Sequence, residues 1–399
     1  MTRIDAAWAQ REDIAAMLAV LDPQGDQCRY VGGAVRDALL QIEATDVDIA
    51  TRLLPDEVIA RLTGAAIKAV PTGIEHGTVT AVLELGPVEI TTLRRDVTTD
   101  GRHAEVAFTD DWREDAARRD FTINALFADP RTLEVSDYFG GEADLAARLV
   151  RFIGDADARI LEDHLRILRF FRFHARFGGA ADADALAACA RHADRLKALS
   201  RERIARELLL LLGSADPLPA AMLMAQAGIW PVILPEMAGD GLDRLRTLLA
   251  REARLGAAAD PLVRLAALLP IEAQVAETVA ARLRLSKAQR AVLGRYAAPW
   301  PGSGTARQVA AGAQPTDNVA NWLLLRGPDA MLTPGWESLK GWSVPDFPLG
   351  GRDVLALGVN AGPAVARVLG ETKRRWIAED FPDRDRIQEI AAQVAASGG

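Results

Sequence analysis

The stretch Tyr30-Val31-Gly32-Gly33-Ala34-Val35-Arg36-Asp37, followed by Asp46-Val47-Asp48-Ile49, decides the fold of this chain. Its first segment predicts a strand, a two-glycine turn and the start of a helix. Glycines at such a turn let backbone N–H groups approach a phosphate because no Cβ stands in the way, and a helix N-terminus adds partial positive charge. Gly33 and Arg36 are therefore candidate phosphate ligands, although a plain tight turn has the same pattern and a carboxylate is an alternative partner for Arg36.

Asp46 and Asp48 are expected on one face of the next strand, because alternate residues of a strand point to the same side. Val47 and Ile49 would then point into the core. The two carboxylates repel each other at this spacing, and a divalent cation that prefers oxygen ligands, such as Mg²⁺, relieves the repulsion. Three other Asp-x-Asp triplets occur in helical or turn-like stretches, so this pair alone is a candidate metal site.

Composition excludes several classes of protein. The chain has 399 residues, of which 49% are hydrophobic and 26% charged, so disordered, collagen-like and coiled-coil architectures do not apply. Two cysteines cannot build a disulfide framework or a Cys-rich zinc module. The N-terminus has no apolar segment of signal-peptide type, and no apolar run approaches the roughly 20 residues of a membrane span. We predict a soluble, cytoplasmic protein with no membrane partner.

The texture of the sequence changes once along the chain. Short β-branched runs with alternating polarity extend from Cys28 to about Asp137, whereas Ala, Leu and Arg dominate after Ala143. We therefore predict an α+β protein in which a small mixed sheet is followed only by helices. Its expected parts are a head at residues 1–142, a helical neck at 143–213, a helical body at 214–300 and a helical tail at 301–399.

Six motifs, taken in order, resemble one family: GGAVRD, DVDIAT, PTGIEHGTVTA, ITTLRRD, RRDFTINALF and EDHLRILRFFRF. Together they resemble the class II tRNA nucleotidyltransferases and their bacterial poly(A) polymerase relatives, within the DNA polymerase β superfamily. The resemblance is strong over residues 28–215, and beyond it FPLGGRDVLALGVNAGP resembles the family's C-terminal segment.

The resemblance implies a polymerase-β-like nucleotidyltransferase head. The implied activity is template-independent addition of CCA to the 3′ end of tRNA from CTP and ATP, with release of pyrophosphate. The implied partner is the tRNA acceptor end, while the oligomeric state stays open. Two alternatives remain: a poly(A) polymerase of the same fold, and a catalytically silent RNA-binding relative.

In such an enzyme, Asp46 and Asp48 would hold two Mg²⁺ ions. Glu89 is the candidate for a third carboxylate, with Glu84 as its competitor. The resemblance further implies that Gly33 and Arg36 cradle the triphosphate. Arg119, within RRDFTINALF, matches a family arginine that contacts the nucleotide.

Base choice is assigned to a helix expected to begin at Leu161. Asp163 and Arg166, three residues apart, would be neighbours on one face of it. An Asp accepts a hydrogen bond from the exocyclic amine of cytosine or adenine, and an Arg donates to the adjacent ring atom. The resemblance assigns these two residues as a protein template, with Arg169 and Arg172 next to them on base or phosphate. The polar, Gly-containing centre of the segment between Arg94 and Asp111 is expected to form a mobile loop.

The net charge of −8 weighs against a nucleic-acid partner at first sight. The charge is not evenly spread, because residues 151–210 hold twelve Lys plus Arg and nine Asp plus Glu. This locally basic segment suits an enzyme that binds one end of a structured RNA and then releases it.

Overall fold

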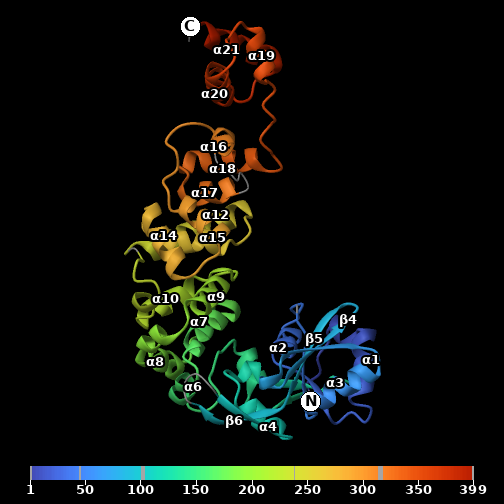
Figure 1. Cartoon of the computed structure of the whole chain (residues 1–399). Helices are drawn as coiled ribbons and strands as arrows, with labels where there is room; N and C mark the ends of the chain where they lie inside the picture. Colours follow the sequence, from blue (N-terminus) through green and yellow to red (C-terminus); the bar gives the residue numbers. More distant parts are fainter. Residues whose placement is uncertain (1, 45, 100–103, 238, 313–317, 398–399) are drawn as a thin grey trace. The chain divides into compact units, whose positions relative to one another are not determined.

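The structure is a computed structural model that describes residues 2–44, 46–99, 104–237, 239–312 and 318–397. The chain divides into two compact units, Met1–Pro235 and Glu236–Gly399. The first unit holds all the described strands and the second is helical (Figure 1). The predicted α+β class is therefore confirmed. The finer division into head, neck, body and tail stays a prediction.

A seven-stranded mixed sheet forms the centre of the head. Its strands, in spatial order, are β3 (Lys68–Gly73), β4 (Thr78–Leu83), β5 (Gly86–Thr92), β2 (Asp48–Thr51), β1 (Cys28–Val31), β8 (Leu126–Ala128) and β9 (Val135–Asp137). Strands β2 and β5 run parallel, and the other described neighbours in this sheet run antiparallel. A separate two-stranded sheet consists of β6 (Arg94–Thr99) and β7 (Ala104–Phe108).

The two faces of the central strands differ in polarity, as alternation along a strand requires. Val47 and Ile49 are buried, as predicted, and Val88 and Ile90 are buried in β5. Asp48 and Glu89 alternate with these residues and point to the opposite face. Part of that face is covered by an apolar cluster that includes Ala50, Phe127 and Trp112.

Helices and short 3-10 turns surround the sheet. In the head they are η1 (Ala7–Gln10), α1 (Glu12–Leu21), α2 (Gly33–Leu39), α3 (Pro55–Gly64), η2 (Ile74–His76), α4 (Trp112–Ala117), η3 (Thr122–Asn124) and α5 (Gly141–Ala146). Those that follow within the first unit are α6 (Ala156–Glu162), α7 (Leu165–Phe177), α8 (Ala183–Arg191), η4 (Ala193–Ala198), α9 (Arg201–Leu212), α10 (Leu218–Gln226) and α11 (Trp230–Ile233).

The second unit consists of helices over its described length. They are α12 (Gly241–Leu255), α13 (Pro261–Leu268), α14 (Ala273–Arg282), α15 (Lys287–Tyr296), α16 (Ala306–Gly312), α17 (Val319–Arg326), α18 (Asp329–Leu339), α19 (Gly351–Ala356), α20 (Pro363–Ala378) and α21 (Arg384–Ala396). Among the described residues, no helix is long and apolar enough to cross a membrane.

Aromatic packing joins helix α7 to the head. Phe121, which precedes η3, has its ring centroid 5.5 Å from that of Phe173 in an edge-to-face arrangement, and Phe152 stacks on Phe170 at 6.0 Å. Both Phe121 and Phe170 are fully buried. Truncation of a buried Phe to Ala lowers the free energy of unfolding by about 3–5 kcal/mol. The contacts of Phe121 and Phe152 therefore hold α7 in place within the first unit.

Candidate active site

Two carboxylates face each other across the parallel strands β2 and β5. Asp48 is the first residue of β2, and its direct register partner in β5 is Glu89. Asp48 is half-buried and Glu89 is exposed. Asp46 was expected on the same strand, but β2 begins only at Asp48, so Asp46 lies two residues before the strand and is exposed. The candidate third carboxylate, Glu89, therefore lies beside Asp48.

Glu84, the competing candidate, lies in the turn between β4 and β5 and not on a strand. Glu89 is thus the acidic residue that the sheet register places opposite Asp48. Within the described part of the chain, no group of three or more His, Cys, Asp or Glu side chains is arranged so that it could hold a metal ion. The metal roles of Asp46, Asp48 and Glu89 accordingly stay predictions.

The electrostatics of this carboxylate pair favour a positive charge. Burial and the neighbouring Glu89 carboxylate raise the pKa of Asp48 to about 6, Asp46 contributes in the same direction, and Arg119 partly opposes the shift. Desolvation and nearby like charge are the two effects that make an ionised carboxylate costly. A cation bound next to Asp48 would remove this cost.

The two-glycine turn follows β1, as predicted. Gly32 has φ +69° and precedes helix α2, where a Cβ would lie 3.3 Å from Nη1 of Arg119. Gly33 is the first residue of α2, and a Cβ there would meet only Nη2 of Arg36, at 3.6 Å. The position that requires glycine is therefore Gly32, since a positive φ disfavours residues that carry a Cβ.

Arg119 lies beside this turn and is held by a carboxylate that the sequence did not single out. Asp115 of helix α4 is buried, and its Oδ2 accepts a hydrogen bond from Nη2 of Arg119 at 2.9 Å. Its Oδ1 accepts from Nε of Arg118 at 2.8 Å. One carboxylate therefore partners two arginines, so the three side chains carry a net positive charge. Of the two arginines, Arg119 lies next to Gly32 and acts electrostatically on Asp48. The spacing of apolar residues in α4 does not indicate that Asp115 binds these two arginines.

Arg36, predicted as a phosphate ligand, is buried and bound to other side chains of the protein. Its side chain is buried, with Nε donating to Oδ1 of Asp37 at 2.8 Å and Nη1 donating to Oδ1 of Asn124. Its guanidinium lies over the rings of Phe173 and Phe177, at 5.2 and 5.0 Å from their centroids. These partners make Arg36 part of the contact between head and neck. A contact with triphosphate stays a prediction.

A continuous chain of polar contacts runs from one turn of α7 through the head to another turn of α7. Asp37 Oδ2 accepts from Arg176, Asn124 Nδ2 donates to Asp120 at 3.0 Å, and Asp120 Oδ2 accepts from Arg169. Arg36 joins Asp37 to Asn124 and so closes the gap between the two ends. The chain fixes α7 relative to the glycine turn. Spacing along one sequence does not reveal such pairings.

The helix expected from Leu161 is interrupted, which corrects the predicted geometry of Asp163 and Arg166. Asp163 separates α6 from α7 and has extended backbone angles, φ −147° and ψ 107°. Its Oδ1 accepts from the backbone N–H of Leu165 at 3.0 Å. The reason is local competition, because an Asp side chain that caps the following turn favours a helix break. The two residues are near neighbours, but they do not share one helical face.

The other predicted residues of this segment have defined partners. Arg166 donates from Nη1 to Glu162 at 2.6 Å and from Nη2 to the backbone oxygen of Arg118 at 2.9 Å. Arg169 pairs with Asp120, and Arg172 donates to Glu207 of α9 at 2.6 Å. The contact with Glu162 therefore orients the guanidinium of Arg166.

The segment between Arg94 and Asp111, whose centre was expected as a loop, contains two paired strands. Strands β6 and β7 form an antiparallel hairpin with partners from Arg94↔Phe108 to Thr99↔Ala104. The β-branched residues at its start favour a strand over a loop. The polar centre of this segment, residues 100–103, lies outside the described residues.

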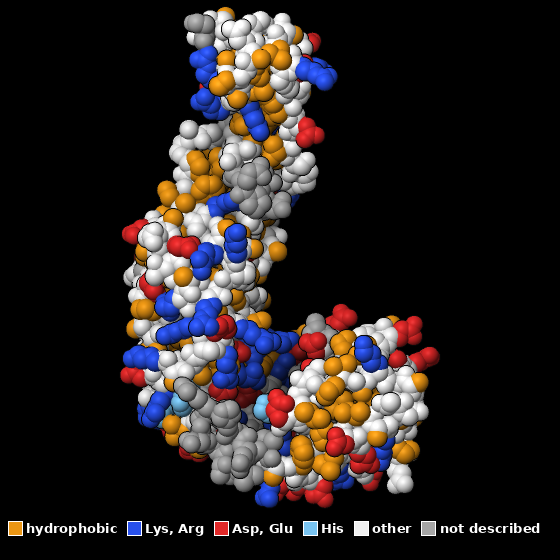
Figure 2. Space-filling model, viewed as in Figure 1, with side chains coloured by type: hydrophobic (Ala, Val, Ile, Leu, Met, Phe, Trp, Pro, Cys, Tyr) orange, Lys and Arg blue, Asp and Glu red, His pale blue; other side chains and the backbone are white. Residues whose placement is uncertain are grey.

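Basic side chains gather on the surface of the neck. On the face drawn in Figure 2, Lys and Arg side chains cluster over the segment that Figure 1 labels α7 and α9. This distribution agrees with the local excess of basic residues over 151–210 in an acidic chain.

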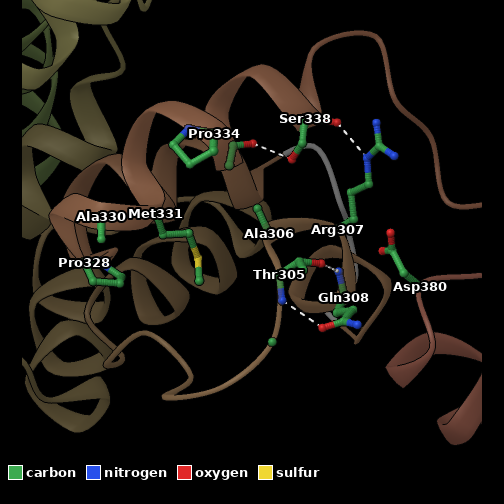
Figure 3. Close-up of a pocket in the computed structure, with 12 residues that line it drawn as sticks. Thr305, Ala306, Arg307, Gln308, Pro328, Ala330, Met331, Pro334, Ser338 and Asp380 are labelled. Carbon is green, nitrogen blue, oxygen red and sulfur yellow. Dashed lines mark hydrogen bonds between the residues drawn. The ribbon is translucent and has the colours of Figure 1, made fainter.

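A cavity of about 740 Å³ lies in the second unit. Met331 and Pro334 of α18 line it, and Arg307 of α16 lies at its edge, with Nε donating to the backbone oxygen of Ser338 at 3.0 Å (Figure 3). None of the residues predicted to act on a nucleotide lines this cavity. It is therefore a feature of the helical unit alone.

Two family models match the chain. One is described as the poly A polymerase head domain and matches residues 28–151. The other is described as the probable RNA and SrmB-binding site of polymerase A and matches residues 182–240. The first match lies in the first half of the sequence, and the second spans its midpoint.

Similarity to curated relatives extends over nearly the whole chain. The CCA tRNA nucleotidyltransferase 1, mitochondrial, of Mus musculus is 35% identical over 385 residues, which cover 92% of this chain and 86% of the relative. The CCA-adding enzyme of Levilactobacillus brevis is 31% identical over 411 residues, covering 95% and 96%.

Solved structures show the same architecture. The Bacillus stearothermophilus CCA-adding enzyme in complex with CTP superposes with a TM-score of 0.76 at 27% identity, covering 97% of this chain and 98% of that one. The Thermotoga maritima CCA-adding enzyme complexed with tRNA superposes with a TM-score of 0.72 at 21% identity and shares the fold.

Proposed function

Because the chain belongs to the family of CCA-adding tRNA nucleotidyltransferases, we propose that it adds C, C and A to the 3′ end of tRNA from CTP and ATP and releases pyrophosphate. The observation that carries this proposal is the similarity over more than nine-tenths of the chain to enzymes of that name. The placement of Asp48, Glu89 and Arg119 around the glycine turn supports it, because transfer of a nucleotide needs both a cation site and positive charge for the triphosphate.

We propose that Asp46 and Asp48, joined by Glu89, hold two Mg²⁺ ions. The donors fit the ion, since Mg²⁺ prefers carboxylate oxygens. The pKa of Asp48 is raised by burial and then by the Glu89 and Asp46 carboxylates, and Arg119 offsets this shift only in part. When bound, the ions would supply activation of the 3′-hydroxyl and neutralisation of the leaving pyrophosphate. The carboxylates of Asp46, Asp48 and Glu89 would determine where the two ions bind.

The residues around the turn would bind the triphosphate. The backbone at Gly32 and Gly33 can approach phosphate oxygens closely, and Arg119 lies within reach of that turn, held by Asp115. Arg118 shares the same carboxylate. Both arginines stay in place before the nucleotide arrives, so little side-chain entropy is lost when it binds.

Asp163 and Arg166 would read the base. The acceptor oxygens of Asp163 suit the amine that cytosine and adenine both carry, and the guanidinium of Arg166 suits the adjacent acceptor atom. Guanine and uracil present the opposite pattern at these positions. Arg169 and Arg172 keep a proposed role next to the base or the phosphates, although each also holds α7 in place through Asp120 and Glu207.

A poly(A) polymerase is the second candidate, favoured by the descriptions of the two matching family models. A silent RNA-binding relative is opposed by the presence of the acidic pair and the base-reading residues. Purified protein with Mg²⁺ and labelled CTP or ATP separates the three. We expect incorporation on tRNAs that lack C74, C75 or A76, and none on complete tRNA. A long A-tail on unrelated RNA would instead indicate the polymerase, and no incorporation would indicate the silent relative.

We propose a cytoplasmic location. Cys28 and Cys189 are both free and buried, which suits a reducing compartment. Mammalian relatives carry "mitochondrial" in their names, so fractionation of the source cells is the test.

A further inference from the structure

An arginine of helix α9 contacts the residue proposed to read the base. Nη2 of Arg203 lies 2.8 Å from Oδ2 of Asp163, forty positions away in the sequence. The other carboxylate oxygen, Oδ1, is occupied by the backbone N–H of Leu165. Both oxygens of Asp163 are therefore fixed by donors from different elements, and the side chain has a defined orientation.

Helix α9 is itself anchored next to this contact. Glu207, one turn after Arg203, is buried and accepts from Arg172 of α7 at 2.6 Å. Ser200 caps the helix by accepting from the backbone N–H of Arg203. The cap at Ser200 and the ion pair of Glu207 with Arg172 hold α9 in place on both sides of Arg203, whose guanidinium contacts Asp163.

Arg166, the other residue proposed to read the base, is also held by a residue of opposite charge. Its Nη1 donates to Glu162, and Glu162 also pairs with Arg159. The proposed acceptor of the base is thus held by a cation, and the proposed donor by an anion. Each keeps hydrogen-bonding capacity, because a carboxylate oxygen accepts more than one bond and a guanidinium has five N–H donors.

We propose that Arg203 is a positioning residue for base selection, which holds the carboxylate of Asp163 so that the incoming base meets an acceptor in a fixed place. This inference rests on the proposed base-reading role of Asp163. Without Arg203 the carboxylate can rotate and accept from a wrongly placed donor. The wrong base is then rejected less strongly, while the transfer chemistry at Asp46 and Asp48 is retained.

The test is the ratio of kcat/KM for CTP to that for UTP, measured on a tRNA that lacks its CCA end. We expect Arg203→Gln to lower this ratio about two- to fivefold, the effect of losing an ion pair that is partly exposed to solvent, and Arg203→Lys to restore part of it. The ratio is measured within one preparation, so partial unfolding cancels. Arg206→Gln removes the same charge from an exposed position on the same helix and should leave the ratio unchanged.

Two further variants separate this inference from the function on which it rests. If Asp163→Ala lowers the ratio and Arg203→Gln does not, the positioning role is wrong and base reading by Asp163 stands. If Asp163→Ala leaves the ratio unchanged, base reading is wrong and the positioning role fails with it. In the double variant Arg203→Gln/Asp163→Ala, we expect no loss beyond that of Asp163→Ala. An additive loss would contradict a shared role.

Discussion

Asp48 and Glu89 are direct partners in the parallel register of β2 and β5, so two carboxylates face each other at the surface of the sheet. The pKa of Asp48 is raised to about 6 by burial and then by Glu89. Carboxylates whose pKa is shifted by burial and by a neighbouring like charge are typical of functional sites. The relationship therefore links the strand register to the proposed cation site.

Replacing Asp48 should stabilise the protein while it abolishes activity. The pKa of Asp48 is about 6 in the folded chain and about 3.9 in an unfolded one. The ionised group thus opposes folding, with no cost below about pH 4, a rising cost between about pH 4 and 6, and the full cost above that range. In EDTA we expect Asp48→Asn to raise the free energy of unfolding at pH 7 by about 1–2 kcal/mol, and to leave it unchanged at pH 4.

Urea denaturation at the two pH values measures this difference. Equal unfolding free energies of the two proteins at pH 7 would contradict the electrostatic description of the site. Nucleotide incorporation by Asp48→Asn at the normal rate would contradict its proposed metal role.

Glu89 and Glu84 form a matched pair of substitutions. Glu89 lies opposite Asp48, whereas Glu84 lies in the β4–β5 turn. We expect Glu89→Gln to raise the Mg²⁺ concentration needed for half-maximal incorporation at least about tenfold, because one ligand charge is lost. Glu84→Gln should leave the Mg²⁺ requirement unchanged. The measurement is the rate of nucleotide incorporation as a function of Mg²⁺ concentration for each variant. If both variants need the same Mg²⁺ concentration for half-maximal activity, Glu89 does not belong to the metal site.

The two glycines of the turn should differ in their tolerance of a methyl group. Gly32 has a positive φ, and its Cβ would crowd Arg119, whereas Gly33 has ordinary space. We expect Gly32→Ala to cost about 1–3 kcal/mol of stability and Gly33→Ala less than about 1 kcal/mol. Thermal unfolding compares them. A larger loss for Gly33→Ala would mean that the strain has been assigned to the wrong residue.

Asp120 should stabilise the protein in a pH-dependent manner. Burial alone would raise its pKa, but Arg169 and the hydrogen bonds from Asn124 and Phe121 outweigh burial and lower the pKa. A carboxyl with a lowered pKa stabilises the folded state above its unfolded pKa of about 3.9, and that stabilisation is lost as pH falls further. We expect Asp120→Asn to cost about 3 kcal/mol at pH 7, with the difference from the original protein shrinking below about pH 4.

The matched control is the exposed pair of Asp194 and Lys197. Asp194→Asn should change the free energy of unfolding by less than about 0.5 kcal/mol. A pH-independent effect of Asp120→Asn would show that the ion pair with Arg169 contributes nothing to stability.

The strands of the central sheet could be predicted from the sequence because their signals are local, but Asp46 was placed on a strand that begins only at Asp48. Alternation placed Val47 and Ile49 in the core, and the Gly32-Gly33 turn marked the end of β1. The break at Asp163 was missed because a capping side chain competes with the helix only once the following backbone is in place. The pairing of β6 with β7 was not predicted, because the polar, Gly-containing centre of the segment indicated only a loop.

The partners of the site residues could not be predicted, because they come from distant parts of the chain. Asp115, Glu207 and Arg203 lie on helices whose spacing is that of ordinary amphipathic segments. Their roles depend on which helices pack together, and this is decided by tertiary contacts such as that of Phe121 with Phe173. The side chains that act on substrate could be named from motifs, whereas those that hold them required the fold.

Sequencing of tRNA 3′ ends tests the proposed activity most directly. A tRNA that ends at the position before C74 is incubated with the protein, Mg²⁺ and equal concentrations of all four nucleoside triphosphates, and its ends are read at increasing times. We expect C, then CC, then CCA, with no further extension and no G or U. Runs of A, continued growth past CCA, or random addition would contradict the proposed selection of bases by the protein.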